Sequence, residues 1–411
     1  MPSNIDLRSA PGPGARGGTG QWLGVSAGFI GWSLDAFNFF VVVFMVGRLA
    51  TEFHVSKAAI IWSLTATLAL RPVGAFFFGI CADRYGRRLS LIANVICFTV
   101  LQVLCGFAPG YVAFLVLRAL FGIGMGGEWG VGASLAMETV PGRWRGLLSG
   151  VLQCGYSLGY LLAAVAARFV LPAWGWRAMF FVGAAPALVA LYICYKMPEP
   201  EAWRVHRAES TGAILRTMGA HGKEFAYLVL LMTLMMFCSH GTQDLYPDFL
   251  MSAHHVAPHS VEMIAILYNC GAILGAFIFG ELSQRAGRRL GMDCALALAL
   301  VVIPLWAFGH TIAMLTVGAF LMQMGIQGAW GVIPAHLTEL APPAARSLLP
   351  GMAYQLGILI AAPTNTFEYA LRDHVGYSWA IGGFELVVIL TTIIVVSLGR
   401  ERHGRDFMQA E

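Results

Sequence analysis

The chain has 411 residues, of which 58% are hydrophobic and only 12% are charged, and its formal net charge is +4 at pH 7. Soluble globular domains carry about 25% charged residues. The composition therefore excludes an ordinary soluble domain and indicates a protein that crosses the membrane many times.

The predicted elements begin after a Gly/Pro-rich segment, 1–21, that lacks the apolar core and cleavage site of a secretory signal. We expect it to be a disordered cytoplasmic tail. Twelve apolar stretches follow, each of the length of about 20 residues that a bilayer-spanning helix needs. They are 22–47, 58–81, 89–107, 111–136, 147–168, 175–196, 225–249, 259–281, 291–308, 312–337, 348–369 and 377–398.

The stretches form two groups of six, separated by the polar segment 197–223. The predicted fold class is an all-α membrane protein with an N-terminal six-helix bundle (22–196), a cytoplasmic linker (197–223), a C-terminal six-helix bundle (224–398) and a cytoplasmic tail (399–411). With the N-terminus placed inside, most Lys and Arg residues of the connecting segments fall on the cytoplasmic side, and only Arg48, Lys57, Arg168, Arg177 and Arg372 fall outside. The positive-inside rule thus predicts that both termini are cytoplasmic. It also explains the basic clusters without nucleic acid as a partner.

A repeat with an offset of 201 residues relates the two halves. The stretch "GICADRYGRR" (79–88) returns as "GELSQRAGRR" (280–289), and "GMGGEWGVGASLAMETVPGRWRG" (124–146) returns as "GIQGAWGVIPAHLTELAPPAARS" (325–347). Among the residue pairs with this offset are Glu138/Glu339 and Arg145/Arg346. Duplicated six-helix halves of this kind place a substrate site at their interface near the midplane, which opens to each side in turn.

The repeated loop sequence resembles the loop 2–3 signature of the major facilitator superfamily, and Arg118-x-x-x-Gly122-x-Gly124 resembles its helix-4 motif. Within the superfamily, "FAPGY" (107–111) and "WGWRAMFFVGAAPAL" (174–188) resemble the sialate:proton symporter group. The stretch "SHGTQDLYPDFL" (239–250) resembles the helix-7 motif of that group's lactate/pyruvate permeases, although Met236 and Asp248 depart from the motif. The resemblance implies a transporter in the plasma membrane that acts as a monomer.

The resemblance also implies that the loop signature gates the transporter at the helix ends rather than contacting substrate. The glycines permit tight turns. The gating residues are Gly79, Asp83, Arg84, Gly86, Arg87 and Arg88 in the first copy, and Gln284, Arg285, Gly287, Arg288 and Arg289 in the second. Because Gln284 replaces the acid of the first copy, we expect the second gate to be weaker.

Charges inside the predicted helices are candidates for function, because a charge at the bilayer centre costs at least about 2.5 kcal/mol. The repeat provides a test, since positions that the fold requires should recur in both halves. Arg71, Arg118 and Glu128 correspond to alanines, Asp35 corresponds to Met236, and His240 and Asp244 correspond to Phe39 and Val43. None of these charges recurs.

Arg71 lies near the middle of helix 2, and its guanidinium can hold a carboxylate through two parallel hydrogen bonds. We expect it to bind the substrate, as the matching arginine of the lactate permeases implies. The alternative is a structural ion pair with Asp35 or Asp244. Asn38, His240 and Gln243 are further candidates for substrate binding.

His240 and Asp244 are one turn apart on helix 7, so their side chains are neighbours. Histidine titrates near neutral pH, which suits a pair that accepts and releases protons. The alternative is a static cluster that caps the outer end of the helix, near a kink expected at Pro247. Asp35 competes with Asp244 as the proton site. Arg118 and Glu128 either take part in proton coupling or form an ion pair with each other.

Other signals are weaker. The eight cysteines form no CxxC pair, and "HHVAPH" (254–259) lies on a predicted external loop, so we expect no metal site and no cofactor. Trp62, Trp129 and Trp330 could stack on a substrate ring, but packing is the simpler role.

The leading hypothesis for function is proton-coupled symport of a small organic anion, a monocarboxylate of the lactate or pyruvate type, with H+ as the coupling ion. A larger acid such as sialate or an aromatic carboxylate is the alternative, and a membrane sensor that does not transport is a more remote one. An enzyme is not expected, because GxxxxGK[ST], HExxH and GxSxG motifs do not occur. Helix 5 lacks the Gly-Pro signature of drug antiporters.

Overall fold

The computed structural model describes residues 17–409, and every regular element in that range is a helix. The N-terminal half consists of α1 (Gly17–Glu52), α2 (Lys57–Tyr85), α3 (Arg87–Gly106), α4 (Tyr111–Thr139) and α5 (Arg145–Lys196). Residues 17–21 belong to α1, which corrects the predicted boundary of the N-terminal tail; residues 1–16 of that tail lie outside the described range.

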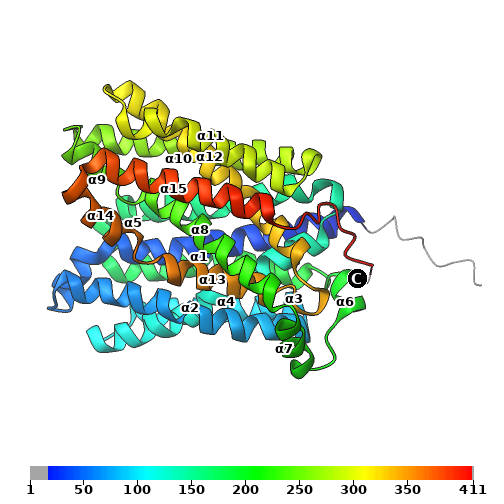
Figure 1. Cartoon of the computed structure of the whole chain (residues 1–411). Coiled ribbons are helices and arrows are strands. Elements are labelled where there is room, and N and C mark those ends of the chain that lie inside the picture. The colour runs from blue at the N-terminus through cyan, green and yellow to red at the C-terminus, as the bar shows by residue number, and fades with distance from the viewer. Residues whose placement is uncertain (1–16, 410–411) are drawn as a thin grey trace, which may run out of the picture.

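The C-terminal half consists of α8 (Gly222–Gln243), α9 (Tyr246–Ser252), α10 (Pro258–Ala286), α11 (Arg288–Phe308), α12 (Ile312–Leu340), α13 (Leu348–Ala361), α14 (Thr364–Val375) and α15 (Tyr377–Leu398). Figure 1 shows the long helices of both halves running roughly side by side. Between residues 22 and 398, ten helical stretches are long and apolar enough to cross a membrane.

Three breaks explain how these stretches relate to the predicted spans. The 52-residue α5 contains a non-helical Gly175 with φ 76°, where one predicted span ends and the next begins. The span predicted for 225–249 divides into α8 and α9, and Pro247 lies in the first turn of α9, where its missing N–H costs nothing. The last predicted span but one divides into α13 and α14. Counting α5 as two spans and α13–α14 as one gives twelve.

Two short helices occupy the connection between the halves, α6 (Glu201–His206) and α7 (Thr211–Ala220). Figure 1 shows α6, α7 and the C-terminus at one end of the bundle, and α9 and α14 near the other. The predicted C-terminal tail is packed against the protein as far as it is described, since Phe407 is 3% exposed.

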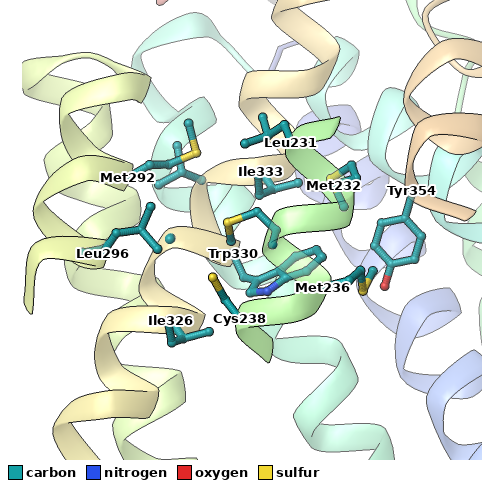
Figure 2. Close-up of a cluster of buried hydrophobic side chains, with 14 of the residues drawn as sticks. Leu231, Met232, Met236, Cys238, Met292, Leu296, Ile326, Trp330, Ile333 and Tyr354 are labelled. Atoms are coloured by element: carbon teal, nitrogen blue, oxygen red, sulfur yellow. The ribbon is translucent and has the colours of Figure 1, made fainter. Parts of the chain in front are cut away.

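Apolar side chains fill the interior of the C-terminal half. Figure 2 shows one cluster in which Trp330 of α12 lies among Met236 and Cys238 of α8 and Ile333 of α12, with Tyr354 of α13 to one side. The unbroken apolar faces of these helices bury against each other, and the outward faces carry many exposed Leu, Ile, Val and Phe side chains. Such a surface suits contact with lipid rather than water.

Candidate functional site between the two halves

The first copy of the loop motif joins the end of α2 to the beginning of α13 in the other half. Asp83 accepts hydrogen bonds from the backbone N–H groups of Ser347 and Leu348, both at 3.0 Å, and it also contacts Arg87. These N–H groups lie at the N-terminus of α13, where they have no partner within the helix and where a negative charge is favourable. The turn itself depends on Gly86, whose φ of 130° only glycine adopts readily.

The second copy makes the same connection in reverse. Gln284, at the end of α10, accepts a hydrogen bond of 2.7 Å from the backbone N–H of Gly146, at the N-terminus of α5. It also accepts one of 3.2 Å from Arg288. Gly287 adopts a φ of 102° in the equivalent turn. The neutral amide thus occupies the place of the Asp83 carboxylate.

Two buried glutamates extend these connections across the halves. Glu138 accepts hydrogen bonds from Arg87 of its own half at 3.0 Å and from Arg346 of the other half at 3.1 Å. Glu339 accepts from Arg288 at 2.9 Å and from Arg145 of the other half at 3.0 Å. Losing one partner of such a buried pair costs about 3–5 kcal/mol, because the other charge is left without compensation.

The remaining arginines of the motif form hydrogen bonds within their own half or to the linker that follows it. Arg84 donates to the carbonyl of Ala208 in the linker at 2.8 Å, and Arg88 donates to the carbonyls of Cys194 and Tyr195. In the second copy Arg289 donates to the carbonyl of Val396, whereas Arg285 pairs only with Glu281 of its own helix.

We call this end of the bundle the closed end, because the two halves touch closely there. A Cβ atom at Gly130 would lie 2.7 Å from the Cα of Gly351, and the hydroxyls of Ser134 and Ser347 are 2.5 Å apart. The contact continues inward to Gln355, which donates to the carbonyl of Gly126 at 3.2 Å.

We call the other end the open end. Among residues 17–409 we find no hydrogen bond or ion pair that joins the halves there. His240 and Asp244 lie at this end, and their side chains are 38% and 37% exposed. Polar contacts thus join the halves at the closed end, whereas a polar pair of one half is exposed at the open end.

The midplane of the N-terminal half contains an ion pair. Arg71, in the middle of α2, donates to Asp35 of α1 at 3.4 Å, and both side chains are almost fully buried. The bond is long and single, and Arg71 Nε and the second oxygen of Asp35 have no partner. The structural ion pair between Arg71 and Asp35 is therefore present, but the guanidinium of Arg71 still has an N–H donor without a partner.

The structure excludes one of the two alternatives for α4, an ion pair within the helix. Arg118 and Glu128 do not pair with each other. Arg118 instead donates to Gln102 at 3.3 Å and lies over the ring of Phe121 at 4.2 Å, whereas both oxygens of the fully buried Glu128 lack a partner. Ten residues place the two side chains about 15 Å apart along the axis, too far for contact.

Asn38 is placed away from the site that we predicted for it. A Cβ atom at Gly183 of α5 would lie 2.3 Å from the side-chain oxygen of Asn38, and Asn38 is 1% exposed. It thus packs inside the N-terminal half.

Aromatic rings line the interface beside Arg71. Tyr354 of α13 stacks on Trp129 with a centroid distance of 4.4 Å and meets Trp32 edge-on at 5.8 Å. Trp32 also lies 5.3 Å from Tyr156 of α5. Trp330 contacts the same Tyr354 ring, at 5.9 Å. Trp129 and Trp330 are thus packing residues in this conformation, and Trp62, at 65% exposure, lies on the outer surface.

At the end of α8, His240 Nδ1 and Asp244 Oδ2 are 3.0 Å apart, and Asn365 of α14 donates to the same oxygen at 2.8 Å. Asp244 follows the last residue of α8, so the cluster also lies at a helix end. This position agrees with the alternative of a static cluster that caps the outer end of the helix. Gln243 turns away from this pair and donates to Gln323 of α12 at 2.6 Å. It joins helices within the C-terminal half, and the structure does not place it with Arg71.

Sequence reasoning missed four buried carboxylates. Glu138 and Glu339 were visible as a repeated pair, but nothing in the sequence showed that each would contact an arginine of the other half. Glu368 and Glu385 are fully buried without hydrogen-bond partners. The repeat could have found them, because the residues 201 positions earlier are Ala167 and Ala184.

The arrangement is that of two related halves with a charged, aromatic-lined interface, which is where a transporter of two repeats has its binding site. A family model described as Major Facilitator Superfamily matches residues 28–247, and one described as Sugar (and other) transporter matches residues 226–401. The chain belongs to the major facilitator superfamily. It is a multi-pass membrane transporter and not an enzyme.

Known proteins are similar over almost the whole chain. A probable 4-methylmuconolactone transporter of Cupriavidus pinatubonensis is 30% identical, covering 92% of this chain and 90% of its own. A carboxylic acid transporter protein homolog of Saccharomyces cerevisiae is 28% identical over 94% of this chain and 69% of its own. The crystal structure of a human organic anion transporter superposes with a TM-score of 0.74 at 16% identity, covering 92% and 99% of the two chains, and supports the fold.

Proposed function

We propose that the protein is a proton-coupled symporter of organic carboxylates in the plasma membrane. The observation that carries the proposal is the guanidinium of Arg71, which is buried at the interface of the halves and held by a single 3.4 Å bond to Asp35. A carboxylate that reaches it can form the short, paired hydrogen bonds that Asp35 does not. Two relatives, the carboxylic acid and 4-methylmuconolactone transporters, are named for organic acids or their lactones.

We infer that the closed end faces the cytoplasm, in keeping with the excess of Arg and Lys in its loops. The conformation is then outward-facing, with His240 and Asp244 exposed to the external solution. A proton taken up by this pair offsets the negative charge of the anion that enters, so the two are moved together. The closed-end contacts must break when the site opens inward.

Two classes of carboxylate are candidates for the substrate, and they differ in size. The helix-7 motif favours a lactate- or pyruvate-type monocarboxylate. The rings of Trp32, Tyr156 and Tyr354 favour a planar cyclic or unsaturated acid, because aromatic faces stack on such rings. Relatives named for niacin and for cis,cis-muconate support this second candidate.

The test is uptake by purified protein in liposomes, with an acid exterior and a neutral interior. Labelled lactate and labelled benzoate are offered separately, and unlabelled pyruvate, nicotinate, muconate and sialate compete. We expect accumulation above the external concentration that collapses when a protonophore is added. Equal uptake with and without the pH gradient would refute proton coupling, and failure of every acid to compete would refute the substrate class.

A further inference from the structure

Two carboxylates of the C-terminal half have surroundings that do not suit an ionised acid. Glu368 of α14 and Glu385 of α15 are both 0% exposed, and all four of their oxygens lack a hydrogen-bond partner. A charged carboxylate buried without a partner is so unfavourable that the group takes up a proton instead. These surroundings favour the neutral, protonated form of both side chains.

The two groups converge on one point of α8. A Cβ atom at Gly241 would lie 2.1 Å from an oxygen of Glu385 and 2.9 Å from one of Glu368. Only glycine leaves room for both carboxyl groups against this helix. Gly241 lies between His240 and Asp244, so the buried carboxyls meet α8 within one turn of the exposed pair.

Among residues 17–409, no cation pairs with either of the two acids. From α8, Cys238, His240 and Asp244 face this region, and His240 is bonded to Asp244. Arg372, one turn beyond Glu368, lies over the Tyr369 ring at 3.8 Å and pairs with Asp373 at 3.3 Å and with Asp248 of α9 at 3.8 Å. Tyr377 of α15 donates to Asp248. The titratable residues of α11 lie near its other end, where Asp293 accepts from Ser397.

Asn365 connects the exposed pair to the buried one. Its Nδ2 donates to Asp244 at 2.8 Å, while its buried Oδ1 has no partner. It precedes Glu368 by three residues on α14, so the two side chains share a face of the helix. Asp244 thus has solvent on one side and the buried acids on the other.

We propose that Glu368 and Glu385 form a buried proton-binding site that is filled from the open end through Asp244 and His240. A proton on the Asp244 carboxyl passes to the Glu368 carboxylate, which becomes neutral and leaves Asp244 negative and ready to take another proton from solution. Glu385 receives its proton from Glu368 in the same way. The inference rests on the proposed function, because it makes Asp244 the entrance for the coupled protons and the glutamates their carriers.

The test uses the full-length Glu368→Gln and Glu385→Gln variants in liposomes. Glutamine has the shape of a protonated glutamate, so we expect both variants to fold and to exchange labelled for unlabelled carboxylate. Accumulation driven by a pH gradient should fall at least tenfold. Glu262→Gln, an exposed acid on α10 at the same end, is the matched control and should accumulate substrate as the wild type does.

Infrared spectroscopy of the detergent-purified wild type provides a second measurement that does not depend on the variants. Protonated buried carboxyls give a C=O band that we expect at neutral pH, weakened in either glutamine variant and unchanged in Glu262→Gln. Absence of the band, or wild-type accumulation by both glutamine variants, would overturn the inference while leaving the symporter proposal intact. A wild type that shows no proton-driven accumulation would overturn both.

Discussion

The two halves of the bundle share a scaffold but differ in the charges that they bury. Away from the closed end, the N-terminal half buries Arg71 and Arg118, together with Asp35 and Glu128. The C-terminal half buries Glu368 and Glu385 against Gly241, with the exposed His240–Asp244 pair beside them, and among residues 17–409 no arginine pairs with either acid.

At the closed end, by contrast, the halves match. Glu138 and Glu339 correspond, and so do Arg87 and Arg288, with the same contacts. The duplication was therefore retained where two symmetric contacts close the protein, and lost where the halves have separate tasks. We infer that fixed positive charge in one half receives the anion, and that titratable acids in the other carry the proton.

The largest effect should come from Arg71. Arg71→Ala removes the guanidinium near Tyr354 and should abolish carboxylate binding. Arg71→Lys keeps the charge but loses the paired geometry, and we expect affinity to fall about tenfold or more, since a hydrogen bond between charged groups contributes about 1.5–3 kcal/mol. Equilibrium binding to the purified protein measures this effect. Arg48→Lys, an exposed change at the open end, is the control, and near wild-type affinity in Arg71→Lys would refute the division of tasks.

Asp244→Asn tests the other half. The amide keeps the shape and a hydrogen bond to His240 but cannot titrate, so proton-driven accumulation should be lost while exchange of substrate for substrate continues. Wild-type uptake should rise as the external pH falls, because the protonated site is the loaded one. The variant should show no such rise. If the variant still concentrates substrate from an acid exterior, the coupled proton does not pass through Asp244 at the end of α8.

Asp35→Asn sharpens the comparison, because Asp35 is the rival proton site. In our assignment its role is to hold Arg71, so the variant should bind the anion a few times more tightly and release it more slowly, with KM and kcat both lowered. Uptake measured over a range of concentrations separates the two constants. Loss of proton-driven accumulation in this variant, comparable to that of Asp244→Asn, would mean that the N-terminal half also carries the proton.

The sequence predicted the scaffold well because two regular signals reinforce each other there. Apolar length set the helices, and the 201-residue repeat set the halves, including the turns at Gly86 and Gly287. Side-chain partners were harder to predict. Spacing along α8 correctly placed His240 beside Asp244. The sequence also made Gln243 a candidate for substrate binding, but its amide donates a hydrogen bond to Gln323 in another helix. Glu128 lacks a partner for the same reason: which charges meet depends on how helices pack, and periodicity does not encode that.

Variants of the matched contacts at the closed end should change transport less than variants of Arg71 or Asp244. Asp83→Asn should slow transport several-fold without changing the affinity for substrate, because Asp83 stabilises the closed end and does not reach the site. Gln284→Glu adds to the second copy the charge that the first one has, next to Arg288 and the N-terminus of α5, and should favour the outward-facing state. Initial rates and binding constants test both variants. A change in substrate preference in either would contradict a purely gating role.

The smallest effect concerns the chain segment that follows each half. In the linker, Trp203 donates to the carbonyl of Asp83 at 3.1 Å; in the C-terminal segment, His403 donates to the carbonyl of Gln284 at 2.9 Å. Each segment therefore covers the motif of its own half. The C-terminal segment also joins the halves through Phe407, which lies under two guanidinium groups from different halves, those of Arg145 at 3.8 Å and Arg346 at 4.1 Å.

Phe407→Ala should remove this link while leaving both arginines paired with their glutamates. A cation–π contact contributes about 0.5 kcal/mol or more, so the closed end should open more readily, and the equilibrium should shift toward the inward-facing state by about twofold or more. Exchange rates and the accessibility of a cysteine introduced at Ser134, where the halves touch, would report that shift. Phe407→Tyr keeps the ring and should behave as the wild type. If Phe407→Ala leaves both measurements unchanged, the segment only covers the second motif, and the two halves are equal in this respect as well.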